Sequence, residues 1–206
     1  MIGVFDSGIG GLSVVKEIKA RLPALSFIYF GDSARYPWGN KSAETIRRYG
    51  REITQFLLGE GVSCIVIACN TASAFAGVYL RREFPSVKFF DVVAPVVERV
   101  RKEYEIYKAA FGVETPFRVG VIGTRGTIAS RVYEKKIQAL GGRIETYGVP
   151  CPLLVPFVEE GWINHPVTYT VVREYVDGLK EKDIHALVLG CTHYPFLKRA
   201  ITKTVG

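Results

Sequence analysis

The chain has 206 residues, of which 48% are hydrophobic and 23% charged, and its formal net charge is +7 at pH 7. This balance is typical of a folded globular protein, and without a long apolar run the sequence predicts no membrane partner. The basic residues are spread over several segments rather than gathered in one tract, so we expect no nucleic-acid partner. An apolar N-terminus without a signal-peptide pattern predicts a cytoplasmic location.

Short apolar runs alternate with longer helical patterns from the first residue onward. This alternation predicts parallel sheets flanked by helices, and hence an α/β fold. In the first half we expect strands at 1–5, 26–30, 62–68 and 87–90, and helices at 12–20, 42–58 and 72–83. In the second half we expect strands at 117–122, 144–147 and 186–189, helices at 128–140 and 169–179, and a proline-rich loop after the strand at 144–147.

The second half is a weak repeat of the first. Gly3–Gly8 matches Gly120–Arg125, and Ile67–Thr71 matches Leu189–His193. Strand-like sequence gives way to a long charged helix near Val93. We therefore predict two pseudo-symmetric α/β domains, residues 1–93 and 94–206.

Two of the four cysteines, Cys69 and Cys191, occupy equivalent places in this repeat. Each follows an apolar strand and precedes residues that can open a helix. A helix N-terminus lowers the pKa of a thiol from about 8.5, so each could be thiol or thiolate near neutral pH. Cys64, inside a strand, and Cys151, in a loop, are interpreted as packing residues. The cysteine spacing matches neither a disulfide scaffold nor a zinc finger.

Two thiols on opposite sides of one carbon can remove a proton from one face and return it to the other. Racemisation needs such a pair of reagents. Asp6 and His193, one beside each cysteine, are the expected helpers, although helix capping by Asp6 and packing of His193 would also explain them. The glycine-rich stretch Gly8–Gly11 lacks the spacing of a nucleotide site, which we consider unlikely there.

Polar residues gather in the same strand-to-helix turns. Ligands of open α/β sheets bind beyond the carboxyl ends of the strands, where these turns lie. Hydroxyl, amide and backbone NH groups at such positions suit a carboxylate or a phosphate. The residues concerned are Ser7, Asp32, Ser33, Asn70, Thr71, Thr124 and Thr192.

Four segments together resemble the signatures of the glutamate racemases, in the aspartate/glutamate racemase superfamily. They are Val4–Ser13, Gly31–Gly39, Ala68–Ser73 and Gly190–Pro195, and their order and spacing fit over essentially the whole chain. The resemblance implies two α/β domains with the active site in the cleft between them. It also implies racemisation of glutamate without a cofactor or metal, supplying D-glutamate for peptidoglycan.

The resemblance also assigns roles to individual residues. By similarity, Cys69 and Cys191 are the acid/base pair, Asp6 assists Cys69, His193 assists Cys191, and Glu159 lies near the second cysteine. The substrate glutamate is the expected partner; a homodimer is one option for an oligomeric state that the sequence leaves open. The groups implied to hold the substrate are Ser7, Asn70, Thr71, Thr127, Thr192 and the backbone of Tyr36, Pro37, Trp38 and Gly39.

Two departures from the family pattern stand out. The family's Pro-Tyr-Gly element is Pro37-Trp38-Gly39 here, a mild change if the backbone makes the contacts. Family members continue with a strand and helix that return to the first domain, so we expect a C-terminally truncated chain whose first domain lacks that segment.

Other interpretations stay open. The chain could be a racemase of the same superfamily acting on aspartate or a hydantoin, or a related decarboxylase, which would need only one of the two thiols. It could instead be an inert binding module, or its two cysteines could form a redox pair or a metal site with His193.

Overall fold

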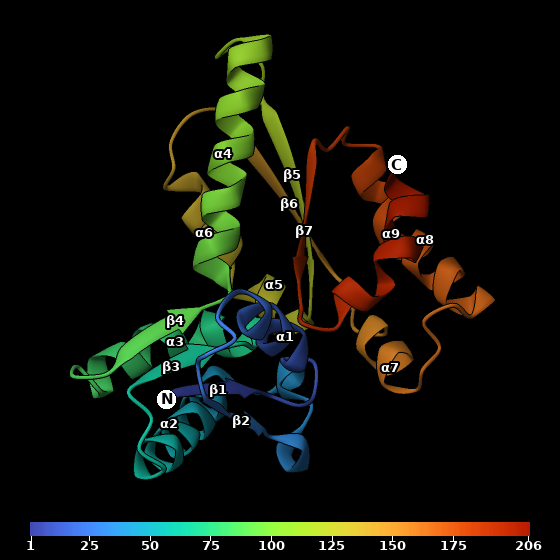
Figure 1. Ribbon diagram of the computed structural model, residues 1–206. Helices are drawn as coiled ribbons and strands as arrows, with labels where there is room; N and C mark the ends of the chain where they lie inside the picture. Colours follow the sequence, from blue (N-terminus) through green and yellow to red (C-terminus); the bar gives the residue numbers. More distant parts are fainter. The chain divides into compact units, whose positions relative to one another are not determined.

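The computed structural model describes residues 1–206. The chain divides into two compact units, Met1–Val92 (unit 1) and Val93–Gly206 (unit 2), each with its own parallel sheet (Figure 1). The predicted α/β class, with two parallel sheets flanked by helices, is confirmed. None of the helices combines the length and apolar character that crossing a membrane requires.

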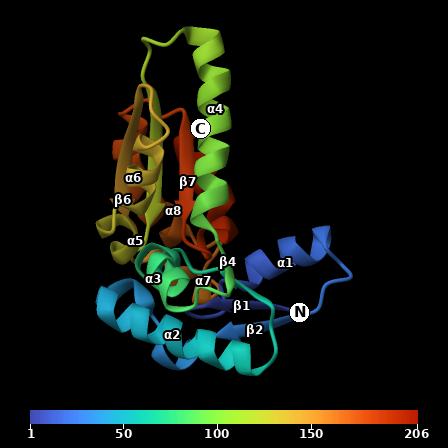
Figure 2. The same ribbon diagram turned by 90° about the vertical axis from the view of Figure 1, so that its left-hand side faces the viewer.

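Unit 1 has a sheet of four parallel strands in the order β2-β1-β3-β4. Its strands are β1 (Ile2–Asp6), β2 (Phe27–Gly31), β3 (Cys64–Ile67) and β4 (Lys88–Asp91). Its helices are α1 (Leu12–Arg21), α2 (Ala43–Gly59) and α3 (Asn70–Glu83), with short 3₁₀ turns at Ser33–Arg35 and Trp38–Asn40. Figures 1 and 2 show α1 and α2 on opposite sides of β1 and β2.

The larger core of unit 1 lies under α2 and α3. The apolar stripe Ile46, Ile53 and Leu57 of α2 packs with Phe5 and Ile67 of the sheet. Ser42 starts α2 by accepting a hydrogen bond from the Thr45 backbone N–H, as an N-cap serine does. A smaller core, with Val4, Val15 and Ala68 at its centre, lies under α1.

Unit 2 has a sheet of three parallel strands in the order β6-β5-β7. Its strands are β5 (Phe117–Gly123), β6 (Ile144–Pro150) and β7 (Ala186–Gly190). Its helices are α4 (Val93–Phe111), α5 (Arg125–Ala129), α6 (Val132–Gln138), α7 (Leu154–Glu159), α8 (Pro166–Lys180) and α9 (Lys198–Val205). Helices α4 and α6 lie on one side of the strands, and α8 and α9 on the other (Figures 1 and 2).

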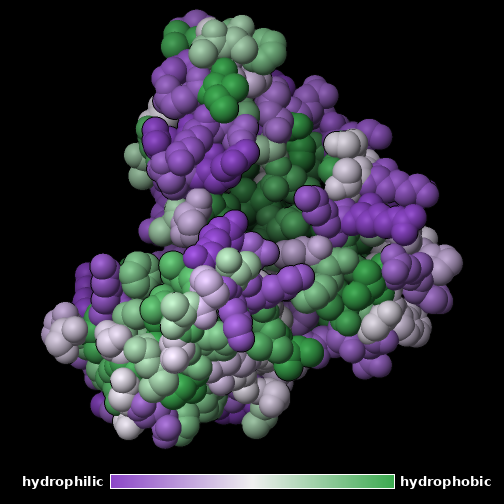
Figure 3. All heavy atoms as spheres, viewed as in Figure 1, coloured by the Kyte–Doolittle hydropathy of each residue, from purple (hydrophilic) through white to green (hydrophobic).

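One hydrophobic core of unit 2 forms between the sheet and the α4–α6 side. Val97 and Val100 of α4 and Ile137 of α6 pack against Val119 and Val121 of β5. In Figure 3 hydrophobic residues also line a hollow beside β7, between α4 and α9, with hydrophilic residues on both sides.

The two sheets place their cysteines in the same way. β1 and β5 are both central strands, and β3 and β7 are the neighbours after which Cys69 and Cys191 follow. The register pairs Phe5 with Ile67 in unit 1 and Ile122 with Leu189 in unit 2. This shared topology gives the weak sequence repeat a structural basis.

Three local expectations from the sequence are wrong. The helix expected at 128–140 is split into α5 and α6, because Arg131 is left-handed (φ 55°) and the Ser130 hydroxyl accepts from the Val132 backbone N–H. The proline-rich loop holds a helix, α7. Cys191 does not open an α-helix, because a 3₁₀ turn at Tyr194–Leu197 comes before α9.

Candidate active site

Cys69 lies at the end of β3, beside the end of β1. The Ala68 backbone N–H donates to the Phe5 carbonyl (2.8 Å), which continues the β1–β3 pairing up to the cysteine. Cys69 is the N-cap of α3, and its Sγ accepts a hydrogen bond from the Ala72 backbone N–H (3.4 Å). The same sulfur lies 3.6 Å from the Ser7 hydroxyl, to which the thiol can donate. The structure therefore brings Cys69 and Ser7 together.

Cys69 holds its proton more tightly than the sequence predicted. Burial and the nearby Asp6 carboxylate raise the pKa of Cys69 to about 12, against the opposing hydrogen bonds from Ala72 and Ser7. The sequence argument used only the helix N-terminus, which favours the thiolate. Desolvation outweighs that effect because the side chain is enclosed on all sides. In this structure Cys69 is a thiol at neutral pH.

Asp6 does not cap the first helix, which was the alternative role considered for it. α1 has Gly11 as its N-cap and no side-chain cap. The fully buried Asp6 side chain instead accepts through Oδ2 from the Gly8 backbone N–H (3.0 Å). Asp6 is thereby held inside the turn next to Cys69, where its charge acts on the thiol.

Asp32 and Ser33 follow β2 and differ in their surroundings. Asp32 is buried, and its carboxylate accepts from the Arg35 Nε (2.7 Å). Its backbone N–H donates to the Asp6 carbonyl (3.1 Å), which ties the two turns together. Arg35 also pairs with Glu52, so Asp32 belongs to a charged network. Ser33 is exposed.

The segment from Tyr36 to Gly39 packs against the same region of unit 1. A Cβ at Gly8 would lie 3.2 Å from the Tyr36 ring, so this ring covers the glycine. Trp38 is only 1% exposed and packs against Tyr49 at 5.4 Å between ring centroids, while its Nε1 has no hydrogen-bond partner. The Trp38 side chain is therefore part of the core, and only the backbone there is available to a ligand.

Asn70 and Thr71 form the first turn of α3, directly after Cys69, and both are buried. The backbone N–H groups of a first helical turn have no partner within the helix, so they favour an anion nearby. The Asn70 amide and the Thr71 hydroxyl thus lie at the same helix end that contacts the Cys69 sulfur.

Cys191 has a different neighbour from Cys69, a histidine. The Cys191 Sγ lies 3.8 Å from the His193 Nδ1, and the Thr192 hydroxyl lies 3.5 Å from the same nitrogen. The His193 Nε2 is 2.6 Å from Glu159 Oε1. A carboxylate at Nε2 favours the tautomer that has its proton on Nε2, which leaves Nδ1 as an acceptor towards the sulfur. The structure thus assembles Cys191, His193 and Glu159 in a row.

Glu159 reaches His193 because it ends α7, the helix that the sequence did not predict. His193 is 3% exposed, whereas 30% of the Glu159 side chain is exposed, so the row runs from the interior to the surface. The Tyr194 hydroxyl donates to the Cys151 carbonyl (2.8 Å) and anchors the turn after Cys191. Cys151 thus contributes its backbone to the site, with its side chain fully buried.

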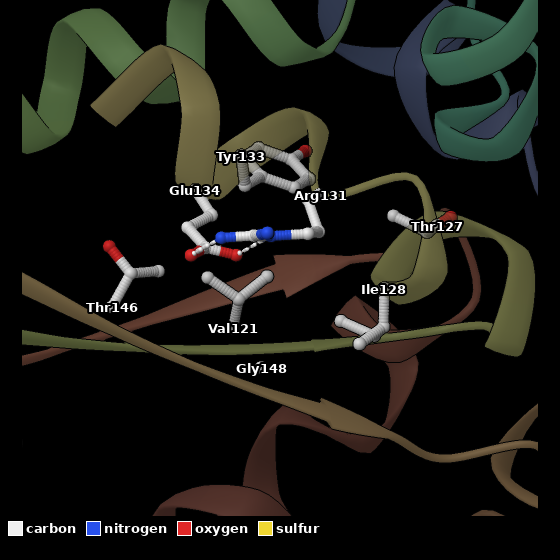
Figure 4. A pocket seen from close by; sticks show the side chains of 8 residues that line it. All are labelled: Val121, Thr127, Ile128, Arg131, Tyr133, Glu134, Thr146 and Gly148. Carbon is white, nitrogen blue, oxygen red and sulfur yellow. Dashed lines mark hydrogen bonds and ion pairs between the residues drawn. The ribbon is translucent and has the colours of Figure 1, made fainter. Parts of the chain in front are cut away.

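Thr124 and Thr127 lie in the turn after β5. Thr124 caps α5 by accepting from the Thr127 backbone N–H (3.1 Å), and the two hydroxyls are 3.0 Å apart. Behind Thr127 a cavity of about 160 Å³ lies between the α5–α6 segment and the sheet. Figure 4 shows Thr146 at its other end and the Arg131–Glu134 ion pair between the two threonines. Thr127 is the single predicted site residue among those lining this cavity.

Each unit therefore gathers its own subset of the predicted residues. In unit 1, hydrogen bonds and charge connect Asp6, Ser7 and Cys69. In unit 2, the side chains of Cys191, Thr192, His193 and Glu159 contact one another.

The sequence analysis missed Tyr29, whose hydroxyl lies under the Asp6 turn. No motif indicates it, since a tyrosine on a strand is ordinarily a packing residue. No group of three or more His, Cys, Asp or Glu side chains could hold a metal ion.

Comparison with known proteins gives a consistent answer over the full chain. Residues 2–206 match the family model described as Asp/Glu/Hydantoin racemase. A glutamate racemase from Geobacter metallireducens is 46% identical over 205 residues, which are 100% of this chain and 72% of that protein. The segments that carried the sequence resemblance thus lie within one continuous match.

Solved structures agree with this match. A glutamate racemase from Francisella tularensis, in complex with D-glutamate, has a TM-score of 0.89 and 40% identity, covering 99% of this chain and 73% of that chain. One from Thermus thermophilus, in complex with β-chloro-D-alanine, has a TM-score of 0.82 and 44% identity, covering 99% and 72%. The chain belongs to the Asp/Glu/Hydantoin racemase family and, within it, to the glutamate racemases, which are isomerases.

Proposed function

We propose that this chain interconverts L- and D-glutamate without a cofactor, by proton transfer between Cα of the substrate and the thiols of Cys69 and Cys191. The observation that carries the proposal is that each thiol has an acid/base helper of its own: Asp6 beside Cys69, and the His193–Glu159 pair beside Cys191. A cysteine that serves only as a packing residue needs no such helper.

In one direction of the reaction, the Cys191 thiol passes its proton to the His193 Nδ1, and the thiolate then removes the proton from Cα. The Cα–H bond breaks, an S–H bond forms, and the electron pair is delocalised into the α-carboxylate. The Cys69 thiol donates its proton to the opposite face of Cα. The raised pKa of Cys69 keeps that proton in place until the carbanion forms.

In the reverse direction, Cys69 must become the base. Its proton then leaves towards Asp6, the carboxylate that already acts on the thiol in the structure. A substrate that displaces water and brings its own ammonium group close to the sulfur favours the thiolate, because a nearby cation lowers the pKa of a thiol. Racemisation requires that the two thiols reach opposite faces of one Cα.

The substrate's charged groups have matching partners in both units. The first turn of α3, with Asn70 and Thr71, suits a carboxylate, and so does the start of α5 with Thr124 and Thr127. The relative from Francisella tularensis was solved with D-glutamate bound, which supports glutamate as the substrate here.

Four further points stay predictions that belong to this proposal. The product D-glutamate would enter peptidoglycan synthesis, and the protein would act in the cytoplasm. The two units would correspond to the domains predicted at residues 1–93 and 94–206. The assembly would be a homodimer.

The decisive experiment incubates the chain with L-glutamate in deuterated water, without added cofactor. We expect deuterium at Cα and D-glutamate to appear together, measured by NMR and chiral chromatography. L-Aspartate and L-alanine serve as substrate controls, and a variant with both Cys69→Ala and Cys191→Ala is the blank. Failure of the folded chain to exchange the Cα proton of glutamate would refute the proposal. Equal turnover of aspartate would refute its substrate assignment.

A further inference from the structure

We propose that Tyr29 is a positioning residue, whose hydroxyl holds the Asp6–Gly11 turn in the geometry that keeps Asp6 beside Cys69. This inference rests on the proposed function, because the turn matters only if Cys69 transfers protons. No sequence motif and no comparison assigns Tyr29 a role.

The Tyr29 hydroxyl is inserted into the glycine-rich turn. It donates a hydrogen bond to the Gly8 carbonyl (2.6 Å), and the Gly11 backbone N–H donates to its oxygen. Gly8 and Gly11 are three residues apart, the spacing at which a turn ordinarily closes through one direct backbone hydrogen bond. The phenol thus takes the place of that bond and connects both ends of the turn to β2.

The turn fits closely around this hydroxyl. A Cβ at Gly11 would lie 2.5 Å from the Asp6 Cβ and 2.9 Å from the Tyr29 oxygen. Gly11 therefore separates Asp6 from Tyr29, and only glycine leaves enough room there. A side chain at position 11 would therefore push on Asp6 and Tyr29 together.

Gly8 transmits the position of Tyr29 to Asp6. The Gly8 carbonyl accepts from Tyr29, while the Gly8 backbone N–H donates to Asp6 Oδ2 (3.0 Å). One residue is thus hydrogen-bonded to both the tyrosine and the carboxylate. If Gly8 moves, the Asp6 carboxylate loses a hydrogen bond that sets its orientation towards Cys69.

The surroundings keep the hydroxyl protonated, so that it always donates. Burial raises the pKa of Tyr29 above its usual range, and the charges of Asp6 and Cys69 raise it further. The pKa of Tyr29 therefore depends on Asp6 and Cys69, the two groups whose geometry it is proposed to hold. It remains a donor to Gly8 throughout the pH range in which the enzyme can be assayed.

The test is Tyr29→Phe, compared with Tyr79→Phe, which removes a hydroxyl from a half-buried tyrosine on the last turns of α3. We expect Tyr29→Phe to lower kcat about tenfold, a loss of the size of one hydrogen-bonded connection, with little change in KM. The pH dependence of Cys69 alkylation by iodoacetamide should move to lower pH, because Asp6 no longer acts fully on the thiol. Tyr79→Phe should match the wild type in both measurements.

The outcomes separate this inference from the proposed function. If the wild type racemises glutamate while Tyr29→Phe has the wild-type kcat and the wild-type alkylation profile, the positioning role is refuted. If the wild type does not racemise, the proposed function fails, and the alkylation profile alone still decides whether Tyr29 acts on Cys69. A drop in thermal stability with an unchanged alkylation profile would mean a structural role only.

Should Tyr29→Phe not fold, amide hydrogen exchange of the wild type gives the answer. The Gly11 amide should exchange as slowly as amides in β1, because the Tyr29 oxygen holds it. Exchange of the Gly11 amide at the rate of an open loop would overturn the inference.

Discussion

The turns that hold Cys69 and Cys191 follow equivalent strands of two similar sheets, yet they surround the thiol with different groups. Cys69 caps a helix, lies beside a buried carboxylate and has a pKa raised to about 12. Cys191 caps no α-helix and lies beside a histidine whose other nitrogen meets Glu159. Equivalent backbone positions therefore do not imply equivalent chemistry.

Under the proposed mechanism, the symmetric reaction uses asymmetric helpers. The two enantiomers have equal free energies, so the enzyme must transfer a proton in both directions equally well. Asp6 can act on the Cys69 thiol through its charge and can accept its proton without a relay. The His193 imidazole can accept the proton of Cys191 and share it with a second carboxylate, Glu159. Substitutions can test whether Asp6 acts only on Cys69 and the His193–Glu159 pair only on Cys191.

The largest effect is expected from removing either thiol. Cys69→Ser and Cys191→Ser should each lower kcat for racemisation by about 10³-fold or more, because a hydroxyl is far less acidic than a thiol and its anion, the base that must remove the Cα proton, scarcely forms at neutral pH. Chiral chromatography of the glutamate formed measures this. Cys64→Ser, on β3, is the matched control and should keep wild-type turnover. Near-normal racemisation by either of the first two variants would contradict the two-thiol scheme.

Asp6→Asn should have the next largest effect, about 10²-fold on kcat, as expected for the loss of an acid/base group. Because the Asp6 charge raises the pKa of Cys69, its removal should lower that pKa. Alkylation of Cys69 followed by mass spectrometry over a pH series should therefore begin at lower pH. Cys151 is an internal reference: burial raises its pKa to about 12 without Asp6, so its profile should stay unchanged. An unchanged Cys69 profile would rule out this role of Asp6.

Glu159→Gln should lower kcat about tenfold, because the neutral amide no longer stabilises a protonated His193. The ratio kcat/KM must fall equally for L- and D-glutamate, since the enantiomers have equal free energies. The kinetic isotope effect should grow only for the Cα-deuterated enantiomer whose proton Cys191 removes. Glu160→Gln, one residue further and exposed, is the control. Equal growth of the isotope effect for both enantiomers would mean that the His193–Glu159 pair assists proton transfer by both thiols.

The smallest effect concerns stability at alkaline pH. Burial raises the pKa of Cys151 to about 12, above the value of about 8.5 for an unfolded thiol. The folded state therefore keeps a proton that the unfolded state loses, so this stabilisation is complete below about pH 8.5 and declines as pH rises towards 12. In urea unfolding from pH 8 to 11, Cys151→Ala should lose stability less steeply than the wild type. Parallel curves would contradict the raised pKa.

The sequence alone located most of the elements that carry the site. The Ser42 cap and the apolar stripe of α2 are local signals, and α2 begins and ends within one residue of the expected range. The apolar runs before Cys69 and Cys191 predicted β3 and β7, so both thiols were expected at the ends of strands. Such features depend on a few neighbouring residues, which is why a pattern can reveal them.

Other features depend on residues that are distant along the chain. The helix α7 was missed because Pro150, Pro152 and Pro156 in and before it indicate a loop, and the helix forms with Leu154 buried in the unit. The Cys69 pKa was misjudged because the enclosure of the thiol and the position of Asp6 come from the packing of β1 against β3. Helix and strand periodicity contains no information about such enclosure.

By itself, the sequence determined the α/β class, the order of the strands along the chain and the placement of a thiol after β3 and after β7, because hydrophobic periodicity and turn residues act locally. Tertiary structure decided what each thiol meets. It placed Tyr29 and Asp6 around the turn that faces Cys69, and it brought Glu159 of α7 to His193. Burial and charge at a sulfur atom depend on neighbours from several segments, and only the folded chain brings those segments together.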